Sequence, residues 1–131
     1  MPVQPTDVSG ALIVKDGRIL IALRPAGKHV GGCWEFPGGK VEPGETAAQS
    51  LKRELKEEFN ITATIGREFA RNIHLYDETH VQIIAFLVES YEGEIQKLEH
   101  DEIRWIDPKD LLDYKLAPAD IPIAEKLMEF L

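Results

Sequence analysis

The chain has 131 residues, 44% of them hydrophobic, and we expect one domain that spans residues 1–131. Its net charge of −8 disfavours binding to a nucleic-acid polymer, and no apolar run approaches the roughly 20 residues of a membrane span. The single cysteine, Cys33, cannot form an internal disulfide, and the first residues do not resemble a signal peptide, so we expect a cytoplasmic protein without a membrane or nucleic-acid partner.

The first half of the chain is predicted to contain two strands, a loop and a helix. Residues 8–15 and 18–24 read as strands joined by Asp16-Gly17, a typical hairpin turn, and residues 25–33 as a glycine-rich loop. In residues 46–59 apolar side chains recur at helical spacing, and Thr46 with Gln49 forms a capping box. Asn60 suits the left-handed conformation that ends a helix.

The second half is predicted to add three strands and two helices. Residues 61–76 and 80–93 are expected to pair as antiparallel strands, and residues 103–106 form a shorter strand. Pro108 opens a short helix over residues 108–114, and residues 119–131 form a closing helix. Because the order shows no regular βαβ alternation, we predict the α/β (α+β) class, with a mixed β-sheet between helices in an α/β/α sandwich.

Three acidic residues lie on one stripe of the predicted helix over residues 46–59. Glu54, Glu57 and Glu58 stand at positions i, i+3 and i+4, where like charges repel. A hard divalent cation would relieve that repulsion, because such cations prefer carboxylate oxygens. Directly before the helix, Gly38-Gly39 and Pro43-Gly44 form a turn that lets a ligand approach the backbone near the helix N-terminus, which favours phosphate. The segment therefore predicts metal-assisted phosphoryl chemistry.

The same segment resembles the signature of a known enzyme family. Gly39, Glu45 and the run RELKEE at residues 53–58 have the identities and spacing of the Nudix box, which here covers residues 39–61. Asn60 replaces the glycine near the end of that box, and asparagine can adopt the same helix-ending conformation. The chain thus resembles Nudix hydrolases of the MutT-like branch, which includes bacterial CTP pyrophosphohydrolases and 8-oxo-dGTP diphosphatases.

The resemblance implies a set of catalytic and metal-binding residues. The implied catalytic residues are Arg53, Glu54, Glu57 and Glu58. The implied ligands of Mg²⁺, or of Mn²⁺ in its place, are Gly38, Glu54, Glu57, Glu58 and Glu99. Within this set Glu54 also activates the attacking water, and Arg53 orients Glu54. Glu102 is the alternative to Glu99.

The resemblance also implies the residues that contact a nucleotide. They are Arg24, His29, Glu35, Phe36, Pro37, Gly38, Gly39, Lys40, His74 and Asp120. Phe36 and Trp34 either stack on the base or pack in the core. Asp120, within LAPADIP (116–122), is expected to face the base. An ionised aspartate accepts hydrogen bonds only, so it would favour the amine of cytosine over the carbonyl of uracil.

The implied function is hydrolysis of a nucleoside triphosphate to a monophosphate and pyrophosphate, with CTP, dCTP and modified or oxidised nucleotides as substrates. The alternative is an 8-oxo-dGTP diphosphatase, and an ADP-ribose hydrolase is a weaker one. A non-catalytic nucleotide-binding module is a remote reading, because a module without catalysis has no use for repelling carboxylates. The partner is then a small nucleotide, and the chain is a monomer or a homodimer.

Overall fold

The computed structural model describes residues 4–76 and 79–131 and arranges them in two four-stranded sheets. The first sheet has the order β5 (Gly38–Lys40), β1 (Thr6–Leu12), β7 (Thr79–Glu92), β6 (Thr62–Tyr76); β1 and β7 are parallel, and the other pairs are antiparallel. In the second sheet β3 (Arg18–Leu23) pairs with β2 (Val14–Lys15), β4 (Trp34–Glu35) and β8 (Glu102–Ile106).

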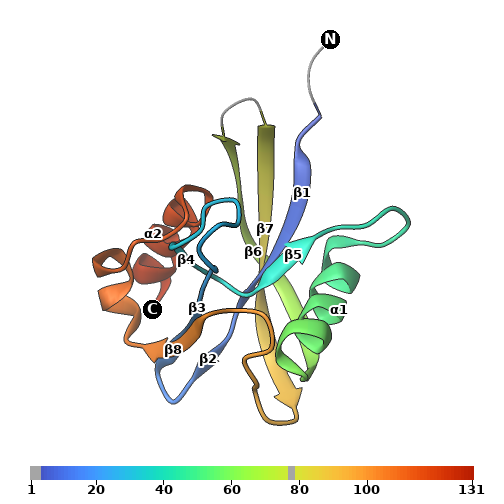
Figure 1. Ribbon diagram of the computed structural model, residues 1–131. Coiled ribbons are helices and arrows are strands. Elements are labelled where there is room, and N and C mark those ends of the chain that lie inside the picture. The colour runs from blue at the N-terminus through green and yellow to red at the C-terminus, as the bar shows by residue number, and fades with distance from the viewer. Residues whose placement is uncertain (1–3, 77–78) are drawn as a thin grey trace.

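Two α-helices lie on opposite sides of these strands (Figure 1). They are α1 (Ala47–Phe59) and α2 (Ile121–Phe130), and two short 3₁₀ helices, η1 (Pro108–Asp113) and η2 (Pro118–Asp120), precede α2. The predicted fold class, a mixed sheet between helices, is therefore confirmed. No helix in the described residues is long and apolar enough to cross a membrane.

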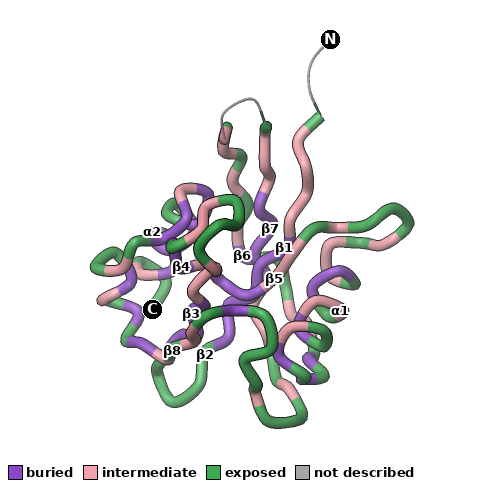
Figure 2. The backbone as a smooth tube through the Cα atoms, in the orientation of Figure 1, coloured by how far each residue is buried: buried purple, intermediate pink, exposed green. Residues whose placement is uncertain are grey.

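Strand β3 divides the core between the two helices, since its side chains alternate across the sheet. Ile19 and Ile21 join the hydrophobic cluster that includes residues of α2, whereas Leu20 and Ala22 join the cluster that includes residues of α1. All four side chains are fully buried, and buried backbone follows the centre of the molecule in Figure 2. Burying an aliphatic side chain contributes about 1.5–3 kcal/mol, so these two layers hold the helices in place.

Helix α1 begins and ends as its sequence predicts. The Thr46 hydroxyl accepts a hydrogen bond from the Gln49 N–H, and the Gln49 side chain accepts one from the Thr46 N–H. At the other end Asn60 has a φ of 56°, the left-handed conformation that terminates the helix. These caps fix which residues of the helix face the loop before it.

The structure differs from the sequence prediction in several local elements. The strand predicted over residues 8–15 is interrupted at Ile13, where the chain leaves the first sheet and enters the second. The predicted short helix at 108–114 is the 3₁₀ helix η1, and the closing helix is divided into η2 and α2. The short strands β4 and β5 were not predicted, because two or three residues carry no readable period.

Candidate active site

Hydroxyl groups hold strand β5 against β1 and α1. Ser9 Oγ donates to the Gly39 carbonyl at 3.2 Å, and Ser50 Oγ donates to the Lys40 carbonyl at 3.1 Å. A Cβ on Gly38 would lie 1.9 Å from the Ser9 carbonyl oxygen, so only glycine permits this approach. The backbone of residues 38–40 is thereby fixed beside the acidic stripe of α1.

Gly39 provides the space for the Glu54 carboxylate. A Cβ at Gly39 would lie 2.4 Å from the carboxyl carbon of Glu54 and 2.6 Å from both of its oxygens. The Glu54 side chain is only 13% exposed and can occupy this position because residue 39 has no side chain. The glycine that opens the box therefore places a carboxylate directly against the β5 backbone.

Arg53 forms the centre of an ion-pair network around Glu54. Its guanidinium donates to both oxygens of Glu45, at 2.7 and 3.2 Å, and to Glu54 Oε1 at 3.0 Å. It also donates to the Lys40 carbonyl and to Glu57 Oε2. The hydrogen bonds from Arg53 lower the pKa of Glu45 to about 2. This geometry agrees with the predicted role of Arg53 in orienting Glu54.

Glu58 lies deeper than its acidic neighbours. Its Oε2 is buried without a hydrogen-bond partner among the described residues. Burial, and then the nearby Glu54 carboxylate, raise the pKa of Glu58 to about 9. A buried carboxyl oxygen without a partner is costly for the fold, and binding of a cation would provide the missing contact.

A cavity of about 440 Å³ lies beside Glu54 and Glu58. Acidic residues gather in it, and its lining includes Glu35, Glu42, Glu54, Glu58, Glu99 and His100. Glu57 does not line it; that side chain is 56% exposed and pairs with Arg53. Of the two candidates for the distal carboxylate, Glu99 lines the cavity, whereas Glu102 pairs with Arg104.

The acidic cavity fits a divalent cation by the chemistry of its donors. Within residues 4–76 and 79–131 no three His, Cys, Asp or Glu side chains are already drawn together as a formed metal site. The unpartnered oxygen of Glu58 and the adjacent Glu54 nevertheless supply the hard oxygen ligands that such cations prefer. Gly38 also lines this cavity through its backbone.

A second cavity, of about 500 Å³, adjoins the first. The two cavities share charged residues and two glycines in their linings: Arg24, Lys28, Glu35, Gly38, Gly39 and Lys40. Further predicted substrate residues line the second cavity, namely His29, Phe36 and Asp120. The basic side chains thus lie where the cavities meet, and a ligand with a phosphate chain and a base could occupy both.

Asp120 is held at the second cavity by the backbone of the segment before β5. Its Oδ2 accepts a hydrogen bond from the Phe36 N–H at 2.9 Å. Burial, and then the Glu35 carboxylate, raise the pKa of Asp120 to about 8. An ionised Asp120 was expected from the sequence, but this raised pKa favours the protonated carboxyl group, which can both donate and accept a hydrogen bond.

Three other predicted residues do not line either cavity in the described part of the chain. His74 packs against the ring of Tyr76, a residue that lines the second cavity, with ring centroids 4.6 Å apart. Pro37 is buried, and its carbonyl accepts from the Ala11 N–H. Trp34 packs against Tyr114 in the core, which answers the choice between stacking and core packing for this residue.

The fold brings two residues to the site that were not predicted from the sequence, His100 and Tyr76. His100 Nε2 donates a hydrogen bond to Glu35 Oε2 at 2.9 Å, and Glu35 Oε1 accepts one from Arg24 at 3.0 Å, so Glu35 links Arg24 to His100. Tyr76 lines the second cavity, where its ring meets His29 edge to face. The position of Tyr76 at the end of a predicted strand is a weak signal, and His100 beside Glu99 gives none.

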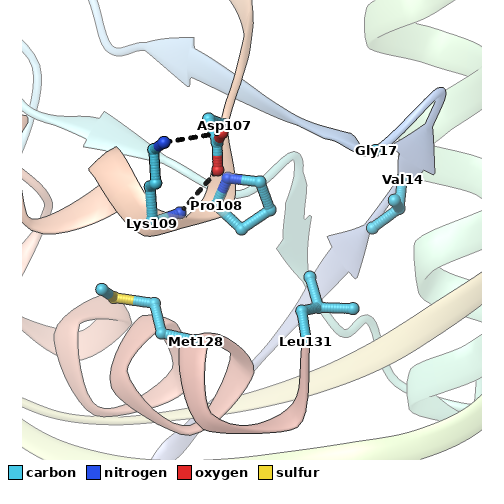
Figure 3. Close-up of a pocket in the computed structure, with 7 residues that line it drawn as sticks. All are labelled: Val14, Gly17, Asp107, Pro108, Lys109, Met128 and Leu131. Carbon is cyan, nitrogen blue, oxygen red and sulfur yellow. Dashed lines mark hydrogen bonds and ion pairs between the residues drawn. The ribbon is translucent and has the colours of Figure 1, made fainter.

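A separate hollow of about 330 Å³ lies at the end of α2 (Figure 3). Its lining is mainly apolar or small, and its charged residues, Asp107 and Lys109, pair with each other. Asp107 also caps η1 by accepting from the Lys109 N–H at 3.1 Å. Among the residues that the structure describes, this hollow therefore lacks the cluster of carboxylates and the neighbouring basic side chains that line the cavity beside α1.

The strands, the capped helix and its carboxylates define a Nudix hydrolase. The family model described as the NUDIX domain matches residues 9–126, and the chain belongs to this family. The predicted family and its hydrolase activity are therefore confirmed, and such enzymes generally need a divalent metal ion. The prediction of one domain over residues 1–131 is not tested by this match and stays a prediction.

Two curated relatives cover most of the chain. The CTP pyrophosphohydrolase of Escherichia coli K12 is 43% identical over 122 residues, which are 93% of this chain and 90% of that protein. The 8-oxo-dGTP diphosphatase of the same organism is 34% identical over 118 residues, which are 90% of this chain and 92% of that protein. Both predicted substrate classes are thus represented among the relatives.

Solved structures agree with this assignment. The solution structure of the E. coli ORF135 protein has a TM-score of 0.89 at 41% identity and covers 98% of this chain and 94% of that one. The crystal structure of a MutT Nudix hydrolase from Burkholderia pseudomallei has a TM-score of 0.86 at 30% identity and covers 95% of this chain and 98% of that one.

Proposed function

We propose that the protein hydrolyses nucleoside triphosphates to monophosphate and pyrophosphate, with CTP and dCTP and modified or oxidised nucleotides as substrates. One observation carries the proposal: the Glu54 carboxylate lies against Gly39, beside the unpartnered oxygen of Glu58, where an acidic cavity meets a larger one that contains Asp120. The relative that is 43% identical bears the name CTP pyrophosphohydrolase, which supports the cytidine substrate.

The metal in this proposal is Mg²⁺, for which Mn²⁺ can substitute, held by Glu54, Glu58, Glu99 and the Gly38 carbonyl. When bound, it would neutralise phosphate charge and lower the pKa of the attacking water. The exposure of Glu57 and its pairing with Arg53 favour an outer position for that residue. Glu57 would therefore reach the metal through water or after a side-chain rotation.

The residues of the chain divide the remaining tasks. Glu54, oriented by Arg53, would take the proton of the water that attacks the triphosphate. Arg24 and Lys40 line both cavities and would bind the phosphate chain between them. Water attacks the β-phosphorus and the bond from that phosphorus to the oxygen bridging the α-phosphate breaks, so that the nucleoside monophosphate is the leaving group and pyrophosphate carries the oxygen of the water.

At the base side Asp120 would recognise cytosine as a neutral carboxyl group. It offers an acceptor for the exocyclic amine of cytosine and a donor for the ring nitrogen beside that amine. Uracil presents the opposite pair at the same edge. The backbone contact to Phe36 fixes one carboxyl oxygen and limits how far the group can rotate to fit uracil.

An 8-oxo-dGTP diphosphatase is the second candidate, and His29 favours it. That side chain lines the larger cavity, and a relative 34% identical to the chain bears this name. The cavity of about 500 Å³ is large enough for a purine. A non-catalytic module is disfavoured, because a buried carboxyl oxygen without a partner, such as Glu58 Oε2 among the described residues, destabilises a fold that does not use it.

The deciding experiment measures pyrophosphate release from a panel of natural and oxidised triphosphates, with Mg²⁺ or Mn²⁺ supplied. We expect CTP, dCTP or 8-oxo-dGTP to be hydrolysed at least about tenfold faster than UTP, which corresponds to about 1.4 kcal/mol. A reaction that releases orthophosphate and diphosphate would refute the proposed bond cleavage. A cytoplasmic location and a monomeric or homodimeric state belong to the same proposal.

A further inference from the structure

The 3₁₀ turn that carries Asp120 is attached to the first sheet by two side chains of β6. The Tyr76 hydroxyl oxygen accepts a hydrogen bond from the Ala119 N–H at 2.8 Å. Asn72 Nδ2 donates to the Ala119 carbonyl at 3.1 Å. Both polar groups of Ala119 are therefore occupied, and Ala119 itself is only 4% exposed.

Asp120 itself is attached to a different segment, because its Oδ2 accepts a hydrogen bond from the Phe36 N–H. The turn is thus hydrogen-bonded both to β6 and to the segment that leads into β5, and its position depends on both attachments. Pro118 begins the turn and fixes one further backbone angle. A small displacement of Ala119 would move the Asp120 carboxyl relative to the base cavity, because the two residues are adjacent.

Tyr76 is suited to this task by its surroundings. Its ring packs against the rings of both His29 and His74, with centroids 4.9 and 4.6 Å away, and these contacts restrict its orientation. Burial raises the pKa of Tyr76 above its usual value, so the hydroxyl remains neutral. Asn72 lies four residues earlier, on the same face of the same strand.

We propose that Tyr76 and Asn72 are positioning residues that set base selectivity, because they hold Ala119 and so place the Asp120 carboxyl in the base cavity. This inference rests on the proposed function. Neither residue takes part in the attack on phosphorus, since both lie on the base side of the site. Loss of either contact therefore changes the discrimination between bases more than the rate of the chemical step.

The test compares the full-length wild type with Tyr76→Phe and Asn72→Ala. Ile73→Thr is the control, because that side chain lies between them on β6 and is 55% exposed. Steady-state pyrophosphate release from CTP and UTP gives KM and kcat, and amide hydrogen exchange reports on Ala119. For Tyr76→Phe we expect at least about fivefold loss of the preference for CTP, mostly in KM, and at least about tenfold faster exchange at Ala119. Asn72→Ala should change the preference in the same direction.

The possible failures can be told apart. If the wild type prefers CTP and Tyr76→Phe keeps that preference, the inference is wrong while the proposed function stands. An equal loss of rate on CTP and UTP, with faster unfolding, would also overturn it, because that is the result of a merely structural role. A wild type without any pyrophosphohydrolase activity would refute the proposed function, and the inference with it.

Discussion

Replacing Glu58 by glutamine should stabilise the metal-free protein while it removes activity. Burial and Glu54 raise the pKa of Glu58 from 4.5 to about 9. The folded chain therefore keeps a proton that the unfolded chain releases at neutral pH. The resulting loss in the free energy of unfolding is absent below the pKa of the unfolded chain, and it grows as the pH rises toward the pKa of the folded chain. Glutamine at position 58 has nearly the same shape and carries no such cost.

The size of the effect follows from the shift. At pH 7.5 the destabilisation of the folded state by Glu58 is at most about 4 kcal/mol, because this pH lies about three units above the ordinary pKa of 4.5 and each unit is worth about 1.4 kcal/mol. Water entry and movement of the Glu54 side chain reduce it, and we expect a gain of about 1–2 kcal/mol in the free energy of unfolding for Glu58→Gln. For a chain of this size that corresponds to a Tm higher by about 3–8 °C.

The assay is chemical and thermal unfolding between pH 5 and 9 in the presence of a chelator. Glu125→Gln, at an exposed position of α2, is the matched control and should behave like the wild type. The wild type should lose stability relative to Glu58→Gln as the pH rises. Turnover with Mg²⁺ should fall by at least about a hundredfold in Glu58→Gln. If the stability of the wild type and that of Glu58→Gln change in parallel with pH, the argument from the burial of Glu58 is refuted.

Three further predictions concern the metal, the glycine and the base. Activity should disappear in excess chelator and return with Mg²⁺ or Mn²⁺, and full activity in the chelator would contradict the metal requirement. Gly39→Ala should lower kcat by at least about tenfold with little loss of Tm, because the new Cβ displaces the Glu54 carboxylate; kinetics and thermal unfolding on the same sample check this. For Asp120, whose pKa is about 8, kcat/KM for CTP should fall as the pH rises through that value and its donor is lost. Asp120→Asn should remove that pH dependence and keep more of the preference over UTP than Asp120→Ala; unchanged preference in Asp120→Ala would exclude Asp120 as the base-reading residue.

Local sequence was sufficient to predict α1 because every signal for this helix is local. The Thr46 capping box, the apolar repeat and the left-handed Asn60 all act within a few residues, and each is found in the structure. The spacing of Gly39 and Glu54 was likewise readable, although their contact is only visible in three dimensions. Short-range rules therefore predicted the part of the site that one segment forms.

The rest of the site depends on contacts between distant segments. The burial of Glu58, the raised pKa of Asp120 and the exposure of Glu57 depend on neighbours that are distant in the sequence, so its periodicity does not reveal them. His100 lies far from Glu35 in the sequence and 2.9 Å from it in the fold. The division of the strands into two sheets at Ile13 was hidden for the same reason, since strand pairing is a long-range property.

The separate attachment of the Asp120 turn has an evolutionary consequence. The turn is attached through Tyr76, Asn72 and Phe36, and none of these contacts involves a residue of α1. Substitutions in the turn can therefore accumulate without disturbing the α1 carboxylates that we propose for the hydrolysis. A family built in this way can acquire new nucleotide preferences one residue at a time, which agrees with the two differently named nucleotide hydrolases among the relatives of this chain.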